Sequence, residues 1–202
     1  MTRSTLSRIR SIAWVAVAVV AVAAAGMLFV DRGGDTGANA PASIGGPFAL
    51  TDQTGRTVTE AALAGHPSAL FFGYTFCPDV CPTTLADITV WLEELGADAD
   101  ALAIYFITVD PERDTREQMA AYLQAFDPRI SGLTGSRAAI DAMLTAYGIY
   151  SRSIPGDNGD YTMDHSASVY LFDSHAKFVG TVDYLEAREA VLAKLRRLLA
   201  AS

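Results

Sequence analysis

The two cysteines of the chain, Cys77 and Cys81, stand four residues apart in the stretch FCPDVCP (76–82). The apolar run SALFFGY (68–74) precedes them and a helical pattern follows. We therefore expect the pair at the carboxyl end of a buried strand and in the first turn of a helix. A helix N-terminus stabilises anions, so at least one thiol should ionise below the usual pKa of about 8.5. Thiolates serve disulfide exchange or soft-metal binding, although such a pair can also form a structural disulfide or stay inert.

The three histidines are the next candidates for chemistry. We interpret His66, in a turn before a buried strand, and His175, at the tip of a C-terminal hairpin, as solvated loop residues. His165 opens an expected strand whose end lies near the cysteines, which makes it a candidate third ligand. Asp164 and the soft thioether of Met163 compete with it, and a lone histidine is more often structural, so the third ligand stays open on this evidence.

The spacing of the cysteines favours metal binding over disulfide exchange. Exchange enzymes of the thioredoxin fold usually carry C-x-x-C and a proline before the following strand. This chain has C-x-x-x-C, and the residues before the strand, YTMDH (161–165), contain no proline. Two thiolates and an imidazole suit Cu(I), and an imidazole also permits Cu(II), whereas structural zinc normally takes four protein ligands. A redox-active Cys77–Cys81 disulfide remains open.

The surrounding elements are read from hydrophobic periodicity. We expect a hairpin (48–52 and 55–58), strands (68–74 and 101–109), helices around 83–96, 119–126, 140–147 and 191–198, a polar turn or loop (154–160), and an antiparallel pair (166–172 and 178–182). Ser136 is the expected N-cap of the third helix. The order predicts an α/β fold: a thioredoxin-like central sheet with parallel strands, helices on its faces and an extra N-terminal hairpin.

The N-terminus predicts a membrane anchor. Basic residues occupy segment 1–10, and the uncharged run Ile12 to Val30 reaches about 28 Å as a helix, close to the bilayer core of roughly 30 Å. We divide the chain into a cytoplasmic segment (1–10), a transmembrane anchor (11–30), a Gly-rich linker (31–45) and a domain (46–202). A cleaved signal peptide is the alternative, and both readings export the domain.

Charge and composition limit the kinds of partner that the chain can bind. The chain of 202 residues has a formal net charge of −8 at pH 7. Such a surface disfavours nucleic acid and attracts cations or a basic protein partner. Two cysteines are too few for the disulfide framework of a small secreted domain.

Three separated motifs carry a family resemblance: CPDVCP (77–82), VDPERDT (109–115) and DHS (164–166). With them, residues 46–199 resemble the Sco/SenC family of copper-binding proteins that help assemble cytochrome c oxidase. The resemblance implies that Cys77, Cys81 and His165 are copper ligands. We place Asp110 and Asp164 in the surroundings of the site, although Asp110 could equally cap the turn before the next helix.

The resemblance also implies a function. It is that of a copper metallochaperone acting on subunit II of cytochrome c oxidase, with Cu(I), and also Cu(II), as the bound ion. A copper donor and a thiol reductant are expected, because a Cys77–Cys81 disulfide has no thiolate to offer. The domain would face the outside of a bacterial plasma membrane, or the intermembrane space from a mitochondrial inner membrane. The rival is an enzyme, a membrane-anchored thiol-disulfide reductase that keeps the cysteines of the oxidase reduced, or more distantly a peroxide reductase.

Overall fold

Residues 44–201 and Trp14 are described by the computed structural model, and residues 44–201 belong to one structural unit. The predicted cytoplasmic segment and membrane anchor lie outside the described residues except for Trp14, as does the linker up to residue 43. Among the described helices, none has the length and apolar character needed to cross a membrane.

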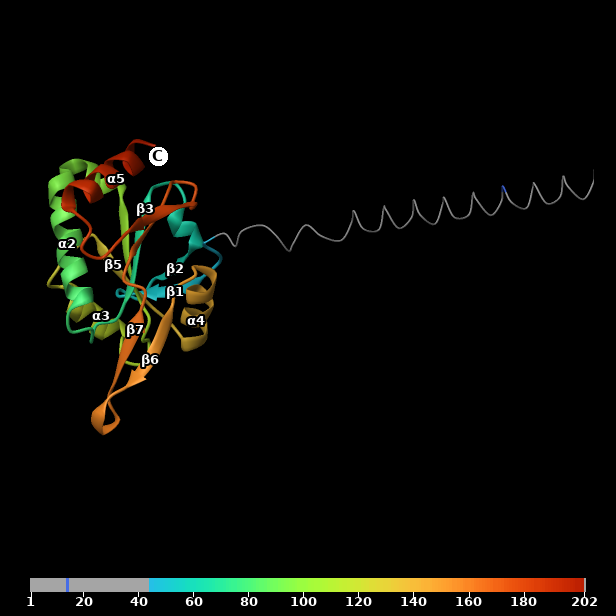
Figure 1. Cartoon of the computed structure of the whole chain (residues 1–202), viewed down its shortest axis with the longest axis vertical. Coiled ribbons are helices and arrows are strands. Elements are labelled where there is room, and N and C mark those ends of the chain that lie inside the picture. The colour runs from blue at the N-terminus through green and yellow to red at the C-terminus, as the bar shows by residue number, and fades with distance from the viewer. Residues whose placement is uncertain (1–13, 15–43, 202) are drawn as a thin grey trace, which may run out of the picture. The chain divides into compact units, whose positions relative to one another are not determined.

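A seven-stranded mixed sheet forms the centre of the domain (Figure 1). Its strands are β1 (Ala49–Asp52), β2 (Thr57–Thr59), β3 (Ser68–Gly73), β4 (Ala103–Thr108), β5 (Ile130–Thr134), β8 (Val169–Phe172) and β9 (Phe178–Val182). They lie in the order β2-β1-β5-β4-β3-β8-β9, with β3, β4 and β5 parallel and the outer strands antiparallel. This confirms the predicted α/β sheet, its parallel centre and both predicted hairpins.

Helices cover both faces of the sheet because β3 and β4 are apolar on both sides. The helices are α2 (Val80–Leu95), α3 (Arg116–Leu123), α4 (Arg137–Ala146) and α5 (Arg188–Ala200), with short 3-10 helices at Glu60–Leu63, Gly96–Ala101 and Asp157–Gly159. On one face, Phe71 packs beside Phe106, whose ring meets Tyr122 of α3, and α5 lies against α2. On the other, Phe72 packs against Tyr147 at the end of α4. The Ser136 hydroxyl accepts a hydrogen bond from Ala139 N, which confirms the predicted N-cap.

The structure corrects the expected path of the chain before β8. The stretch read as a polar turn (154–160) is the end of a separate hairpin, formed by β6 (Ser151–Pro155) and β7 (Tyr161–His165). His165 therefore ends β7 and does not open the strand of the main sheet, which starts only at Val169. Ser166 N still donates to Tyr150 O, so pairing with the β6 side continues past His165 before the chain enters the sheet.

The loop between β4 and α3 is held by a buried carboxylate. Asp114 accepts hydrogen bonds from Thr75 N at 3.1 Å and from the hydroxyls of Thr75 and Thr108, each at 2.6 Å. Its own side chain is excluded from solvent. Asp114 thus joins the loop to the chain that follows β3, two residues before Cys77.

Replacing Asp114 with alanine should lower the free energy of unfolding by about 2–4 kcal/mol, because buried donors on Thr75 and Thr108 would lose their acceptor. Asp98→Ala is the matched control, since Asp98 is exposed and its removal should change stability by no more than about 0.5 kcal/mol. Denaturant unfolding of the two variants measures the difference. Equal stabilities would contradict the role assigned to this carboxylate.

Candidate metal centre

The two cysteines come from different structural environments. Cys77 lies in the turn after β3, where its backbone N donates to Tyr74 O at 3.2 Å, and it is half-buried. Cys81 is the second residue of α2 and is fully buried. Both thiols are free. The strand, turn and helix start predicted from the sequence therefore place them as expected.

The sulfur of Cys77 caps the N-terminus of α2. The residue at the N-cap position, Asp79, makes no capping hydrogen bond through its side chain. Instead, Cys77 Sγ accepts a hydrogen bond from Cys81 N at 3.4 Å, within the group of N–H donors that a helix leaves unpaired at its start. Those donors and the helix dipole favour a negative charge on the sulfur.

The pKa values of the two thiols move in opposite directions. The Cys81 thiol donates to the Cys77 sulfur, and His165 and the backbone N–H groups of Cys81 and Asp79 add to this, so the pKa of Cys77 falls to about 3 despite its partial burial. The same interaction with Cys77, together with burial, raises the pKa of Cys81. The metal-free pair thus holds one thiolate and one thiol at neutral pH.

Gly73, the last residue of β3, makes room for the buried sulfur. A Cβ at this position would stand 2.7 Å from Cys81 Sγ and 2.8 Å from Phe106 Cε2. Neither neighbour can retreat, because both are buried in the core. The absence of a side chain at Gly73 is therefore what lets Cys81 Sγ lie against the strand.

The imidazole of His165 reaches the cysteines from β7. Its Nδ1 lies 2.9 Å from the carbonyl oxygen of Ser166, which can only accept, so Nδ1 carries the proton. Nε2 faces Cys81 Sγ at 3.6 Å and is the ring nitrogen placed to bind a metal ion. The ring of Tyr74 meets the imidazole edge-on, with centroids 5.7 Å apart and planes at 87°. A hydrogen bond and an aromatic contact thus aim Nε2 at the two sulfurs.

Three donor atoms converge as a result. The ligand atoms of Cys77, Cys81 and His165 all lie within 4.8 Å of one another. In the described part of the chain, these three residues form the cluster of side chains that could hold a metal ion. Two sulfurs and one neutral imidazole nitrogen are a soft donor set for a three-coordinate ion. The residues that the sequence singled out as metal ligands are thus brought together, and metal binding itself stays a prediction.

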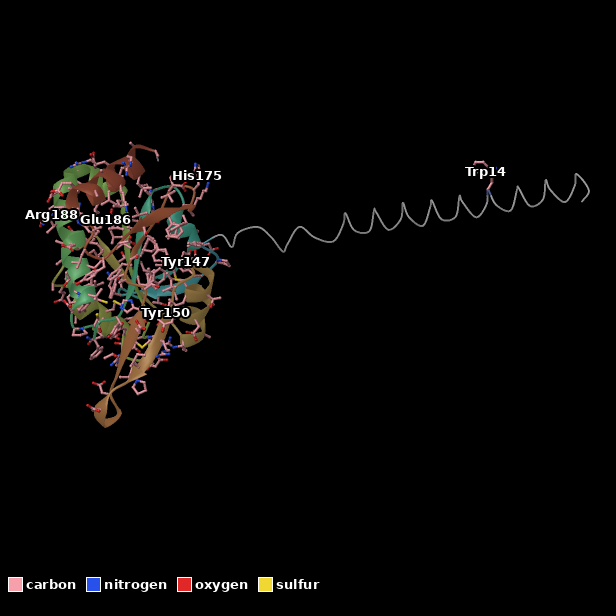
Figure 2. All side chains as sticks on the ribbon, viewed as in Figure 1. Trp14, Tyr147, Tyr150, His175, Glu186 and Arg188 are labelled. Atoms are coloured by element: carbon pink, nitrogen blue, oxygen red, sulfur yellow. The ribbon has the colours of Figure 1, made fainter. Side chains whose placement is uncertain are left out.

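The other two histidines stand apart from this group. His66 is partly buried and His175 is exposed at the β8–β9 turn. Figure 2 shows His175 at the end of the domain away from the β6–β7 hairpin. Neither His66 nor His175 belongs to the convergent group. His165 differs from them in lying close to the two cysteines.

Asp164 and Asp110, the residues predicted to surround the site, differ in their burial and in their contacts. Asp164 has an exposed side chain and accepts a hydrogen bond from Tyr150 OH at 3.3 Å, because alternate residues of β7 point to opposite sides and His165 takes the inner one. Asp110 is buried and contacts Arg113 and Tyr161 rather than a cysteine or His165. Its carbonyl also accepts from the backbone N–H of Asp114, as expected of a turn-forming residue.

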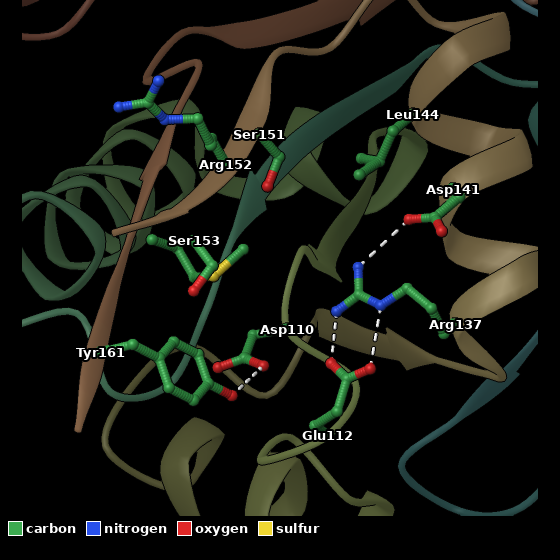
Figure 3. Close-up of a pocket in the computed structure, with 10 residues that line it drawn as sticks. Asp110, Glu112, Arg137, Asp141, Leu144, Ser151, Arg152, Ser153 and Tyr161 are labelled. Carbon is green, nitrogen blue, oxygen red and sulfur yellow. Dashed lines mark hydrogen bonds and ion pairs between the residues drawn. The ribbon is translucent and has the colours of Figure 1, made fainter. Parts of the chain in front are cut away.

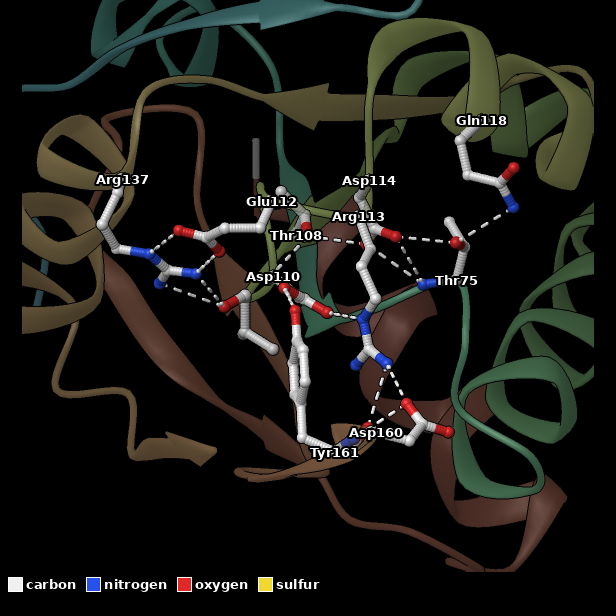
Figure 4. A network of polar contacts seen from close by, with 11 residues as sticks. Thr75, Thr108, Asp110, Glu112, Arg113, Asp114, Gln118, Arg137, Asp160 and Tyr161 are labelled. Carbon is white, nitrogen blue, oxygen red and sulfur yellow. Dashed lines mark hydrogen bonds and ion pairs between the residues drawn. The ribbon is translucent and has the colours of Figure 1, made fainter. Parts of the chain in front are cut away.

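Sequence reasoning missed Arg113 and Tyr161, which connect the loop after β4 to β7 (Figure 4). Arg113 Nη1 donates to the carbonyl oxygen of Tyr161 at 2.9 Å, and its guanidinium carbon lies 3.7 Å from the centre of the Tyr161 ring. The motif VDPERDT contains Arg113. Its partner Tyr161 could have been predicted only if the β6–β7 hairpin had been recognised.

A cavity of about 440 Å³ lies beside Asp110 and Tyr161 (Figure 3). Its wall includes Tyr161 and Met163 from β7 and Arg137 from α4. Arg137 is paired with Glu112 and Asp141, so its charge is already compensated. None of the three convergent ligands lines the cavity, and it is therefore a space separate from the candidate centre.

Comparison with known proteins gives a consistent result. The family model described as SCO1/SenC matches residues 36–200. Protein SCO2, mitochondrial, of Saccharomyces cerevisiae is 39% identical over 164 residues, covering 79% of this chain and 54% of that protein.

Two solved structures are also similar. The structure of Bradyrhizobium japonicum ScoI with copper bound has a TM-score of 0.73 and 48% identity, covering 77% of this chain and 99% of that one. Yeast Sco1 with copper bound has a TM-score of 0.73 and 34% identity, covering 79% and 90%. The chain spans about half the length of the first curated relatives it matches.

The unequal thiols predict an unusual reactivity in the metal-free, reduced protein. Iodoacetamide should modify Cys77 first, at a rate nearly constant between pH 5 and 8, because a thiol with a pKa of about 3 is already ionised throughout that range. An ordinary thiol would slow about tenfold for each unit of decreasing pH below its pKa. Mass spectrometry of timed digests gives both the site and the rate.

Cys81→Ala supplies the control, because it removes the donor that contributes most to the low pKa of Cys77. The rate for Cys77 in this variant should regain a dependence on pH. A steep pH dependence in the parent protein, or faster modification of Cys81, would contradict the assigned ionisation.

Proposed function

The chain belongs to the SCO1/SenC family, and from this premise we propose that Cys77, Cys81 and His165 bind one copper ion that the protein delivers to cytochrome c oxidase. The observation that carries the proposal is the convergence of two sulfurs and Nε2 within 4.8 Å. It is supported by the copper-bound structures of relatives with 48% and 34% identity. Copper is here the cargo of a metallochaperone, and the same atoms must both hold it and release it.

The donor set favours Cu(I). Two thiolates are soft ligands, and three donors match the low coordination number that Cu(I) accepts, whereas a structural zinc site normally has four protein ligands. The imidazole also allows Cu(II). Binding requires Cys81 to lose its proton, while Cys77 already holds a thiolate, so loading releases a proton to solvent.

The burial of the ligands suggests an order of release. Cys81 is fully buried, whereas Cys77 and His165 are each partly exposed. An acceptor that approaches from solvent can therefore replace His165 or Cys77 before Cys81. Stepwise exchange of this kind keeps the ion coordinated throughout the transfer.

The proposed acceptor is the dinuclear copper centre of cytochrome c oxidase subunit II. The net charge of −8 would favour a basic surface on the partner. We place the domain on the outer side of a bacterial plasma membrane, held by the predicted anchor, with the intermembrane-space side of a mitochondrial inner membrane as the alternative. A copper donor and a reductant for the cysteine pair complete the cycle.

A second candidate function rests on the cysteine pair alone. The thiolate of Cys77 beside the thiol of Cys81 is also the arrangement that a dithiol reductase uses: the first attacks a disulfide and the second resolves the mixed disulfide. In this function the protein would reduce the cysteines of the oxidase. His165 separates the two proposals, because disulfide exchange does not require it.

His165→Ala should weaken Cu(I) binding by more than about 100-fold, since a direct ligand is lost and the loss of even an outer partner costs 10- to 100-fold in related sites. Competition with a Cu(I) chelator measures the affinity. His175→Ala is the matched control, because its ring is exposed at the β8–β9 turn and it should bind copper like the parent.

The same variants distinguish delivery from reduction. In cells that depend on this protein, His165→Ala should fail to restore the copper centre of the oxidase while the purified variant still reduces a model disulfide. If His165→Ala restored the oxidase fully, the reductase function would be favoured over copper delivery. Parent-like copper affinity in His165→Ala would show the ligand assignment to be wrong.

A further inference from the structure

The strand that carries His165 is not part of the main sheet. In the described residues, β6 and β7 pair only with each other, in a two-stranded sheet of their own. The cysteines, by contrast, follow β3 at the centre of the seven-stranded sheet. The distance between the third ligand and the two sulfurs is therefore not fixed by a ladder of backbone hydrogen bonds. It depends on side chains that hold β7 against the body of the domain.

Arg113 is the residue at which these holding contacts concentrate (Figure 4). Its Nε donates to the buried carboxylate of Asp110, and its Nη1 donates to Tyr161 O. The guanidinium stacks on the Tyr161 ring at 3.7 Å and lies 5.0 Å from the ring of Phe76 and 5.6 Å from that of Tyr74. One side chain thus touches the turn that leads to Cys77 and the strand that ends at His165.

The partners of Arg113 extend these contacts to the imidazole. Tyr161 OH donates to Asp110 at 2.8 Å, so the first residue of β7 is held through both its backbone and its ring. Tyr74, beside the guanidinium, is the residue whose ring packs edge-on against His165. Tyr161 and His165 lie on the same side of β7, because alternate residues of a strand share a face.

The cysteines also have contacts of their own that do not involve Arg113. Asp114 fixes Thr75, the helix N-terminus fixes the Cys77 sulfur, and Gly73 accommodates Cys81. Loss of Arg113 should therefore release β7 while leaving the pair of sulfurs in place.

The hydrogen bonding of Arg113 is incomplete. Its Nη2 is buried and has no partner among the described residues. Buried polar groups are nearly always paired, so a side chain present only for stability would be expected to satisfy this donor. The arrangement instead places a planar, delocalised cation where it meets three aromatic rings at once, which a lysine cannot reproduce.

We propose that Arg113 is a positioning residue for His165, the third ligand of the copper site. This role rests on the proposed function. Arg113 holds β7 through Tyr161 so that His165 Nε2 stays within reach of Cys77 and Cys81. Without it, the two cysteines would still bind Cu(I), but the imidazole would leave the coordination sphere.

The test compares Arg113→Ala with the parent in the purified full chain. Arg137→Ala is the matched control: it also removes an ion-paired arginine bound to this loop, through Glu112, but one that makes no hydrogen bond or ion pair with the described residues of β7. In the metal-free protein, nuclear Overhauser effects between the rings of Tyr74 and His165 should weaken in Arg113→Ala and persist in Arg137→Ala. This readout requires no copper.

A second readout reports the ligand directly. Nitrogen hyperfine coupling in the electron paramagnetic resonance of the Cu(II)-loaded protein should be lost in Arg113→Ala, and Cu(I) affinity should fall about 10- to 100-fold, as for other residues that orient a metal ligand. Arg113→Lys should not rescue the coupling, since an ammonium cannot donate to Asp110 and stack on Tyr161 in the same way.

Tyr161→Leu provides an independent variant if Arg113→Ala fails to fold. It removes the stacking surface on β7 and leaves Arg113 its ion pair with Asp110, and it should show the same loss of nitrogen coupling. Unchanged ring contacts and parent-like nitrogen coupling in the folded variants would overturn the positioning role while leaving the copper site intact. A parent protein that binds no copper would instead overturn the proposed function, and the ring contacts would then decide the role of Arg113 alone.

Discussion

The loop between β4 and α3 holds together two segments that the sheet does not connect. Asp114 binds the chain before Cys77, while Asp110 and Arg113 of the same loop bind the start of β7. Both carboxylates are excluded from solvent, and a buried charge is tolerated only where donors surround it. The arrangement of sulfurs and imidazole therefore depends on this polar network in addition to the apolar core.

The two sulfurs have a different origin from the imidazole. They follow from the thioredoxin-like fold itself, in which a buried strand ends, a turn follows and a helix begins. The free N–H groups of α2 stabilise the Cys77 thiolate, and the absent side chain of Gly73 admits Cys81 Sγ. The imidazole is supplied by an added hairpin, so the fold contributes a reactive thiol pair and the hairpin converts it into a three-donor site. Exchange chemistry and metal binding are thus alternatives for the same two residues.

Hydrophobic periodicity predicted the core elements because they are long and buried. The strand around 68–74, the helix before Gly96 and the final hairpin all formed as expected. The strand β5 was missed, since its short sequence ISGLT includes a glycine and shows no alternation. Of the hairpin β6–β7, only the middle, residues 154–160, was noted, as a polar turn or loop, and the hairpin was not recognised because none of the residues in its two strands is fully buried, which leaves no apolar pattern. His165 was selected mainly through the family resemblance and was expected to open the strand of the main sheet, whereas the structure places it at the end of β7, within the convergent group. Arg113 could not be selected, because its partner lies 48 residues away in that unrecognised hairpin.

If Cys77, Cys81 and His165 bind copper as proposed, the ion has two sulfur ligands and one nitrogen ligand. X-ray absorption spectroscopy at the copper edge, on the purified full chain loaded with one equivalent of Cu(I) under reducing conditions, measures this directly. We predict a three-coordinate ion with two sulfur scatterers and one nitrogen scatterer whose outer-shell pattern is that of an imidazole. A two-coordinate ion with sulfur neighbours alone would contradict it, because His165 would then not be a ligand.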